Sequence, residues 1–524
     1  MAVLKADFIG RVASGAEYLW WRSEEGMRTT IALFRSGRQT GTTCLPIEAV
    51  LFDREGGVAA RWQFELQPER ACIIDSGVAG PWTTAGPING VLALYVCPDP
   101  PQDPRQTDST LRLYPLVTWR RADGRIASLH SDHALSLGTS QPQRFTEIVV
   151  CESEDERNAL VIVNGETPQA AAALTLTVQN AAHEARSARY APAMAPHTVH
   201  RIVLADLFSD LPHFAGSDAL LVSGTFASLD LETRPYVETT GQRWGLYHAG
   251  DVYKWHPRPY LQHAYVDGEV NPMAVVNNDV VTTWVNLLHS HDGMEDDTPV
   301  DVRLFDDAGR CVASRPRWKV ARRHKLTRFC ASELLEDPSQ PFSGHIAITF
   351  SPEPGQDVPY HVQALMEYRS AHVVARVMGW SDEWNSDIKR ARRSRLGQAD
   401  EIRAYFMVWN DAELESLVAI ANAGHSHYQD SATAELTLLG PDGPVMKDTI
   451  SIAPYASAFF AVGERFPAWR EHLKAGTALL IISSCSDLAS IAFTRHRSSG
   501  ALAAEHFLAL WDWTGTHYTE AAGS

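Results

Sequence analysis

The sequence lacks the close cysteine pairs and long apolar runs that mark several classes of protein. Its 7 cysteines are scattered, and none forms a Cys-x-x-Cys pair, which argues against a zinc ribbon or a thioredoxin-type redox site. An odd number of isolated cysteines is typical of reduced thiols in a cytoplasmic protein. No apolar run approaches the about 18–20 residues that a membrane span needs. Residues 1–7 do not resemble a secretory signal, so we expect no membrane association.

Several catalytic and nucleotide-binding motifs are also missing. There is no Gly-x-Ser-x-Gly elbow, no phosphate-binding loop, no Gly-x-Gly-x-x-Gly after a strand and no His-Glu-x-x-His pair. These absences argue against an ordinary α/β-hydrolase, a nucleotide-dependent enzyme and a zinc metalloprotease of that type. The 63 acidic residues exceed the 46 basic ones, giving a net charge of −17. This excess of negative charge argues against nucleic acid and against an anionic membrane as a general partner.

The patterns that are present favour β-structure. Short runs rich in Val, Ile, Leu, Thr and aromatic residues are separated by Gly, Pro, Asp and Asn, whereas long amphipathic helical patterns are rare. The chain has 524 residues, more than one hydrophobic core usually serves, so several domains are expected. The sequence therefore predicts an all-β protein of several domains.

Internal repeats divide the chain into related parts. Residues 344–357 match residues 90–103 at an offset of 344 − 90 = 254, and residues 304–306 match residues 51–53 at 304 − 51 = 253. Residues 476–483 match residues 216–223 at 476 − 216 = 260. Offsets this similar indicate two duplicated halves, each containing two units, in an A-B-A-B order.

Each unit has the length and strand content of an immunoglobulin-like β-sandwich. We therefore predict four tandem immunoglobulin-like β-sandwich units arranged as a duplicated pair. Their predicted bounds are 1–142 for unit 1, 143–255 for unit 2, 256–385 for unit 3 and 400–524 for unit 4, with a basic linker at 386–399. The basic run within this linker, 389–395, could bind phosphates, but a solvated linker is the commoner use of such a run.

A second recurrence involves asparagine and histidine. Residues 286–291 have the sequence Asn-Leu-Leu-His-Ser-His, and residues 422–427 have the sequence Asn-Ala-Gly-His-Ser-His. Both segments follow an apolar run and precede another one. This pattern predicts the same strand–loop–strand unit at two places in the chain.

The paired histidines are candidate metal ligands. On a strand, residues i and i+2 point to one face, so His289 with His291 and His425 with His427 could hold a divalent metal such as zinc, iron or manganese. Glu295 would act as a further ligand or as a base. The alternative, which we favour, places both pairs in polar hairpin loops without a metal, because the spacing identifies no third ligand in both copies.

Unit 4 resembles the small sandwich of the sensory-rhodopsin-transducer family. The resemblance rests on Asn422-Ala423-Gly424, on the strand 434–438, on residues 488–495 and on Arg497-Ser498. Unit 2 has a weaker form of the same pattern, with Asn164-Gly165 and Arg234. The resemblance implies a cytoplasmic, oligomeric sandwich with a binding role.

The segment that joins the two halves is rich in aromatic and polar side chains. Tyr253, Trp255, His256, Arg258 and Tyr260 could line a pocket for a small polar or carbohydrate-like ligand, because pockets often form between domains. The alternative is a rigid connector whose rings pack between sandwiches.

Our leading hypothesis is a non-catalytic, cytoplasmic binding or scaffold protein. Its partner would be a small molecule or a protein held at the junction of the halves, with no cofactor. A metal-dependent enzyme built on the histidine pairs is one alternative. A self-assembling structural protein, such as a homo-oligomer, is another, because the edges of sandwiches can pair.

Overall fold

The computed structural model describes residues 17–34, 44–96, 115–130, 143–227, 234–253, 269–288, 297–353, 363–380, 402–422, 431–484 and 486–511, apart from short gaps inside these ranges. Within them the chain forms eight antiparallel sheets of four or five strands. The sheets pair into four sandwich units arranged in tandem, so the predicted all-β architecture is confirmed.

Unit 1 contains the sheets β1-β6-β3-β4 and β5-β2-β7-β8. Its strands are β1 (Glu17–Arg22), β2 (Met27–Leu33), β3 (Leu45–Phe52), β4 (Val58–Leu66), β5 (Cys72–Asp75), β6 (Asn89–Val96), β7 (Leu116–Arg121) and β8 (Ile126–His130). The outer strand β4 shows the period of two that places one face on the core: Trp62 and Phe64 are half-buried, while Arg61 and Gln63 are exposed.

Unit 2 repeats this order in the sheets β12-β11-β14-β9-β17 and β13-β10-β15-β16. Its elements are β9 (Gln143–Val150), β10 (Glu156–Val163), β11 (Leu174–Gln179), β12 (Ala185–Tyr190), β13 (Val199–Val203), α2 (Leu204–Leu207), α3 (Leu211–Ala215), β14 (Leu220–Phe226), β15 (Tyr236–Gly241), β16 (Gly245–His248) and β17 (Val252–Tyr253). Among the described residues, the short helices and the fifth strand of one sheet distinguish it from unit 1.

Unit 3 has the sheets β18-β23-β20-β21 and β22-β19-β24-β25. Its elements are β18 (Glu269–Asn277), β19 (Thr282–Leu288), β20 (Thr298–Asp306), β21 (Cys311–Ala321), β22 (Leu326–Cys330), the 3₁₀-helix η1 (Ala331–Leu334), β23 (Phe342–Phe350), β24 (Gln363–Arg369) and β25 (Val374–Trp380).

Unit 4 has the sheets β29-β28-β31-β26-β34 and β30-β27-β32-β33. Its elements are β26 (Ile402–Trp409), β27 (Leu414–Ala421), β28 (Ala432–Gly440), β29 (Gly443–Ile452), β30 (Ser457–Ala461), α5 (Val462–Arg465), α6 (Trp469–His472), β31 (Thr477–Ser484), β32 (Ala489–His496), β33 (Leu502–His506) and β34 (Leu508–Trp511). Like unit 2, it has two short helices after the fifth strand of the unit and an added edge strand.

The A-B-A-B order is therefore visible in the elements themselves. All four units share one strand order, and units 2 and 4 share the paired helices and the added strand in the described residues. The shared order differs from the 1-2-5-4 and 3-6-7 sheets of an immunoglobulin constant domain, so the likeness to that domain is one of architecture. The exact boundaries between units, and the linker 386–399, lie outside the described residues.

The register of the strands supports the duplication residue by residue. Gly90 in β6 lies against Phe52 of β3, and Gly344 in β23 lies against Phe305 of β20. A Cβ atom would lie 1.9 Å from the Phe52 carbonyl oxygen at Gly90 and 2.1 Å from the Phe305 carbonyl oxygen at Gly344. Both copies therefore need glycine for the same reason, a close approach of the neighbouring backbone.

The asparagine recurrence does not mark equivalent positions. Asn286 lies inside β19, whereas Asn422 follows the end of β27. The counterpart of Asn422 is Asn164, which follows β10; their Nδ2 groups donate to the carbonyls of Ala453 (3.2 Å) and Ala195 (2.8 Å). The predicted strand–loop–strand unit is present at both places, as β19 with β20 and β27 with β28, but Asn286 and Asn422 occupy different positions in it.

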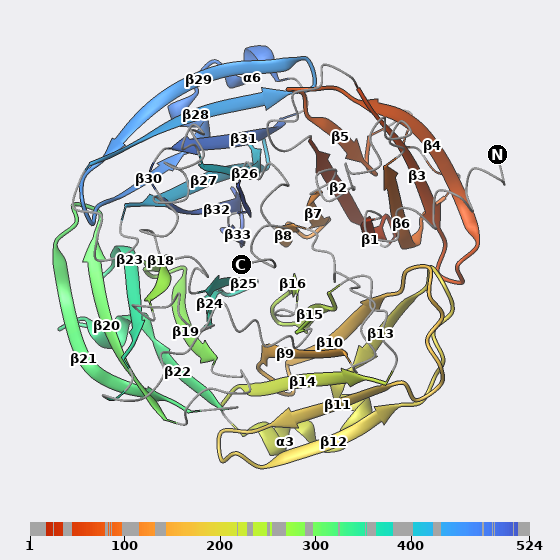
Figure 1. The fold of residues 1–524 in the computed structure, drawn as a ribbon, viewed down its shortest axis with the longest axis horizontal. Helices are drawn as coiled ribbons and strands as arrows, with labels where there is room; N and C mark the ends of the chain where they lie inside the picture. The colour runs from red at the N-terminus through yellow and green to blue at the C-terminus, as the bar shows by residue number, and fades with distance from the viewer. Residues whose placement is uncertain are drawn as a thin grey trace, which may run out of the picture.

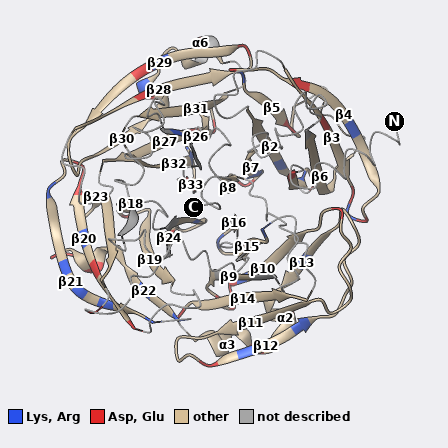
Figure 2. Ribbon diagram, viewed as in Figure 1, with Lys and Arg blue, Asp and Glu red and all other residues tan. Residues whose placement is uncertain are grey.

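The four units form a closed ring (Figure 1). The strands β8, β16, β25 and β33 lie at its centre, where each contacts the next, including β33 of unit 4 with β8 of unit 1. The strands β4, β12, β21 and β29 form the rim, and Figure 2 shows basic and acidic residues along parts of these strands. Buried apolar clusters cross all four junctions between neighbouring units. No helix in the described part of the chain is long and apolar enough to cross a membrane.

Candidate functional site

The junctions between units are of two kinds. Units 1 and 2 meet through stacked rings, with Phe52 and His197 centred 3.9 Å apart, and units 3 and 4 meet through Phe305 and Tyr455 at 5.5 Å. The first of these junctions also contains an ion pair between Arg22 Nη1 and Glu238 at 3.0 Å. The other two, between units 2 and 3 and between units 4 and 1, have arginines at equivalent positions and are compared below.

Equivalent arginines lie at these two junctions. Arg120 in β7 and Arg369 in β24 each follow an aromatic residue, and each reaches the unit that precedes it around the ring. Arg369 Nη1 lies 3.2 Å from Cys151 Sγ, and the Arg120 guanidinium lies 5.0 Å from the centre of the Trp409 ring. We call the junction of units 2 and 3 the filled junction and that of units 4 and 1 the open junction.

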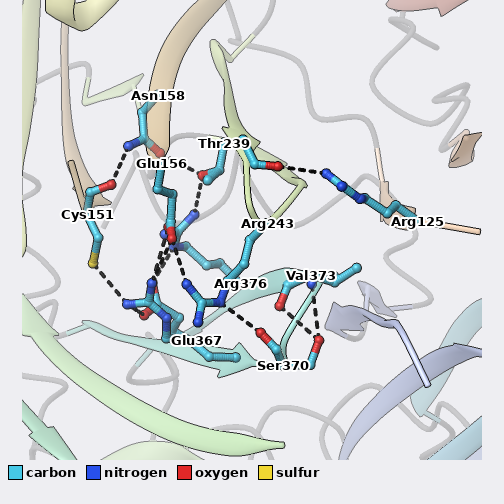
Figure 3. A network of polar contacts seen from close by, with 12 residues as sticks. Arg125, Cys151, Glu156, Asn158, Thr239, Arg243, Glu367, Ser370, Val373 and Arg376 are labelled. Atoms are coloured by element: carbon cyan, nitrogen blue, oxygen red, sulfur yellow. Dashed lines mark hydrogen bonds and ion pairs between the residues drawn. The ribbon is translucent and has the colours of Figure 1, made fainter. Parts of the chain in front are cut away.

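The chain's own side chains occupy the filled junction (Figure 3). The Glu156 carboxylate accepts from Arg369 Nη2 at 3.1 Å and from Arg243 Nη1 at 2.9 Å. Arg243 Nε also donates to the carbonyl of Ser370 at 2.8 Å. One carboxylate thus joins two guanidiniums across the junction.

Behind these groups lies a fully buried ion pair. Arg376 Nε donates to Glu367 at 2.6 Å, and neither side chain is exposed to solvent. Burial by itself raises the pKa of Glu367, but the guanidiniums of Arg376, Arg369 and Arg328 outweigh it and lower that pKa to about 2. Arg376 Nη1 also donates to Thr239 of unit 2 at 3.1 Å. This network is structural, because its charges are directed at one another.

The open junction contains a cavity of about 190 Å³ instead. Its walls come from both units. The lining residues are Gly26, Arg28, Arg120, Arg121, Ala122, Gly124, Arg125 and Ile126 of unit 1 with Glu413, Leu414 and His496 of unit 4. Four of these eleven residues are arginines, and one is a glutamate.

Three of the four arginines have no arginine counterpart at the filled junction. Thr29 and Thr283 make the same hydrogen bonds to the first strand of their units, so the preceding residues, Arg28 and Thr282, correspond. The turns after β7 and β24 are each closed by a backbone hydrogen bond. These bonds run from Arg121 to Arg125 in unit 1 and from Ser370 to Val373 in unit 3. Thr282, Ser370 and Val373 therefore stand where the open junction has guanidiniums.

Unit 4 has a leucine where unit 2 has Glu156, although its Asp411 and Glu413 lie 3.6 and 3.4 Å from Arg120. The turn bond from Ser153 N to Glu156 O recurs from Asp411 N to Leu414 O, so Leu414 replaces the carboxylate of Glu156. The buried ion pair has an uncharged counterpart in unit 1, where Thr118 and Ser128 are 3.0 Å apart at the equivalent cross-strand position. The two junctions thus share a backbone but differ in charge.

Carboxylates contact all four arginines of the open junction, and one of these carboxylates, Glu413, lines the cavity 3.4 Å from Arg120. Asp75 binds Arg28 through two oxygens at 2.6 and 2.7 Å, and Asp123 lies 3.2 Å from Arg121 and 3.4 Å from Arg125. Neither aspartate lines the cavity. The guanidiniums are therefore oriented by partners while they still form the wall.

The Arg120 guanidinium has a less favourable environment than its counterpart. Burial lowers the pKa of Arg120, and the charge of Arg28 lowers it further. Burial also lowers the pKa of Arg369, but Glu367 and its neighbours outweigh that effect and raise this pKa. Asp411 and Glu413 of unit 4, 3.6 and 3.4 Å from Arg120, offset the lowering of its pKa only in part, whereas at the filled junction the carboxylates outweigh it.

A second, smaller cavity lies near the centre of the ring. It measures about 10 Å³ and is lined by residues of all four units, among them His248, Arg376 and Glu505. His130 Nδ1 lies 2.8 Å from Glu505 of unit 4, and its ring packs edge-on against that of His248. A cavity of this size holds about one water molecule, so it is too small for an organic ligand.

Most of the site residues predicted from the sequence lie outside the described part of the chain. The backbone of Tyr253 pairs with Arg144 in β9, but its side chain lies outside the described residues. Also outside them are Trp255, His256, Arg258, Tyr260, His289, His291, Glu295, His425, His427 and the run 389–395. Within the described part of the chain, no three His, Cys, Asp or Glu side chains gather as a metal site.

Sequence reasoning missed the arginines of the open junction. Arg28, Arg121 and Arg125 look like ordinary surface residues when the chain is taken alone. A comparison of the two duplicated halves would have revealed them, because the second half has uncharged residues at those positions. That comparison needs the strand register, which the sequence repeats supply only in part.

Comparison with known proteins identifies no family. No family model matches the sequence, and no curated protein matches it. Among solved structures, one similar chain is described as the tetra-tandem repeat in the extending region of a large adhesion protein. It is 10% identical, the match covers 90% of this chain and 92% of that chain, and the TM-score is 0.09. This likeness carries no structural or functional argument.

Proposed function

We propose that this protein is a non-catalytic binding protein whose small polar ligand lies in the open junction. The observation that carries the proposal is the contrast between two equivalent junctions. One is occupied by Glu156, Arg243 and Arg369, and the other has a cavity of about 190 Å³. Both join the two halves of the chain, but the sequence analysis expected the ligand at the other one, beside the connector between units 2 and 3.

The composition of the site favours binding over catalysis. Four of the eleven wall residues are arginines, which hold and orient polar groups but do not exchange protons readily near neutral pH, and only Glu413 and His496 of the wall can do so. The resemblance of unit 4 to the sensory-rhodopsin-transducer family supports a binding role as well. A cytoplasmic location and the ligand site around Tyr253, Trp255, His256, Arg258 and Tyr260 stay predictions.

A thermal-shift screen with an obstructed variant tests the proposal. Ala122 is exposed at the edge of the cavity, so Ala122→Trp adds bulk there without entering the core. Small sugars, sugar acids, phosphorylated sugars and dicarboxylates are screened by differential scanning fluorimetry. A ligand at 100 times its Kd is expected to stabilise the wild type by about 2.7 kcal/mol, and Ala122→Trp to lose that shift.

The matched control is Ala59→Trp, an exposed alanine of β4 on the rim of the same unit. It should melt like the wild type and keep the ligand-induced shift. The proposal fails if no class of compound stabilises the wild type. It also fails if the stabilisation survives in Ala122→Trp, because the ligand would then bind elsewhere.

A further inference from the structure

We infer that the ligand of the open junction is a small phosphate-type anion, either free phosphate or the phosphate group of a small phosphomonoester. The inference rests on the proposed function and specifies the chemical class of the ligand. It draws on the charge of the cavity wall, on its size and on the uncharged residues at the equivalent positions of the filled junction.

The cavity wall has the donors that a phosphate group needs. Arg28, Arg120, Arg121 and Arg125 come from β2, β7 and the turn that follows β7, and His496 approaches from unit 4. Guanidinium groups bind phosphate through paired N–H donors, which gives both strength and orientation. A phosphate offers three or four acceptor oxygens to several arginines, whereas a carboxylate offers two.

At least one guanidinium has donors available for a ligand. Among the described residues, the Arg121 side chain contacts Asp123 through Nε at 3.2 Å. This contact uses one of the five N–H donors of the group. Arg125 differs, because its Nη1 donates to the carbonyl of Gly241 in unit 2 at 2.9 Å. Arg121 is therefore the arginine whose removal disturbs the ring least.

The electrostatic environment of Arg120 also favours an anionic ligand. The Arg120 guanidinium is largely buried and lies near the like charge of Arg28. Asp411 and Glu413 lie 3.6 and 3.4 Å from Arg120 and offset this repulsion in part. An anion bound between the two guanidiniums would offset it further. At the filled junction the side chains of Glu156 and Glu367 relieve the corresponding charge of Arg369. Leu414 and Thr118 at the equivalent positions carry no charge.

The volume limits the ligand. Pockets for drug-sized molecules usually measure about 300–1,000 Å³. The open junction, at about 190 Å³, accommodates a phosphate with a small organic group in preference to a nucleotide. The walls around it are rigid strands and one tight turn, so the site is preformed.

Calorimetric titration of the full chain tests the inference. The probes are inorganic phosphate, a hexose 6-phosphate, the uncharged hexose and malonate, all at one ionic strength. The variants Arg121→Ser and Arg125→Val introduce the residues that unit 3 has at these positions. We expect each to weaken the Kd for the phosphate probe about tenfold or more, because each removes a hydrogen bond between two charged groups.

Arg61→Ser is the control, since Arg61 lies on β4 and contacts Glu48 at 3.2 Å. It should bind phosphate as the wild type does. The probe that binds more tightly, free phosphate or hexose phosphate, identifies the source of the anion. Unchanged affinity in both arginine variants overturns the inference, as does tighter binding of malonate.

The two proposals can fail separately. If the uncharged hexose binds and the phosphate probes do not, the anion inference is wrong while the binding function stands. The anion inference is likewise wrong, and the binding function stands, if another uncharged compound of the screen binds in place of the phosphate probes and Ala122→Trp abolishes its binding. If nothing binds the wild type, both proposals fall.

Discussion

Replacing Glu367 by glutamine is expected to lower the free energy of unfolding by about 3–5 kcal/mol, because it leaves Arg376 buried without a carboxylate. The Arg376 side chain has no exposed surface, and Glu367 is its partner at 2.6 Å. A guanidinium cannot shed its proton to escape this environment. Equilibrium unfolding in urea, followed by tryptophan fluorescence, measures the loss.

The reciprocal variant should be milder. Arg376→Met leaves Glu367 with Arg328 at 2.8 Å and Arg369 at 3.4 Å, so the carboxylate keeps two partners. The double variant Glu367→Leu/Arg376→Met removes both charges and fills similar volume, which is often neutral or even stabilising. The expected order of stability loss is therefore Glu367→Gln, then Arg376→Met, then the double variant.

A loss in Arg376→Met as large as that in Glu367→Gln would contradict this account, because it would mean that the other two arginines do not stabilise Glu367. Unit 1 provides independent support. At the equivalent position it has Thr118 and Ser128, 3.0 Å apart, in place of the ion pair. The fold therefore does not require a charge here, and the pair serves the junction of units 2 and 3.

The sequence predicted the sandwiches and their duplication because these depend on local patterns. Alternating strands and the repeated glycines, such as Gly90 and Gly344, are visible in the chain itself. The two asparagines suggested equivalent positions in their strands, although similar residues can occur at different registers of a strand. Their hydrogen-bond partners, which differ, distinguish Asn286 from Asn422.

The closed ring and the open junction could not be predicted. Their contacts join residues far apart in sequence, such as Arg120 and Glu413, which are separated by 293 positions. No local pattern encodes such a pairing. The arginines belong to no recognisable sequence motif. They become candidate ligand-binding residues because they line one cavity and because uncharged residues, such as Ser370, replace them in the other half.

Substituting His345 by valine is expected to remove a large part of the acid sensitivity of the fold. His345 in β23 is fully buried, and neither ring nitrogen has a hydrogen-bond partner among the described residues. Its ring stacks on Phe305 at 5.1 Å. Unit 1 has Val91 at this position, since Val91 pairs with Phe52 as His345 pairs with Phe305. The duplicated fold thus works without the imidazole.

The sign of this pH effect follows from the pKa of His345. Burial lowers this pKa from 6.5 to about 4, and the charge of Arg303 contributes to the lowering. Between these two values the unfolded chain binds a proton that the native state does not. The contribution of His345 to the free energy of unfolding therefore falls as the pH falls from about 6.5 to about 4 and changes no further below that. The shift of 6.5 − 4 = 2.5 units corresponds to about 3 kcal/mol.

Urea unfolding of the wild type and of His345→Val between pH 7 and pH 4 measures this effect. At pH 7 the variant is expected to be the less stable protein, because valine is smaller and leaves a cavity beside Phe305. As the pH falls, the wild type should lose stability faster by up to about 3 kcal/mol, so that the two curves converge and cross. All other groups titrate alike in both proteins and cancel in the difference. Parallel curves would show that the imidazole is protonated, or reaches solvent, in the native state.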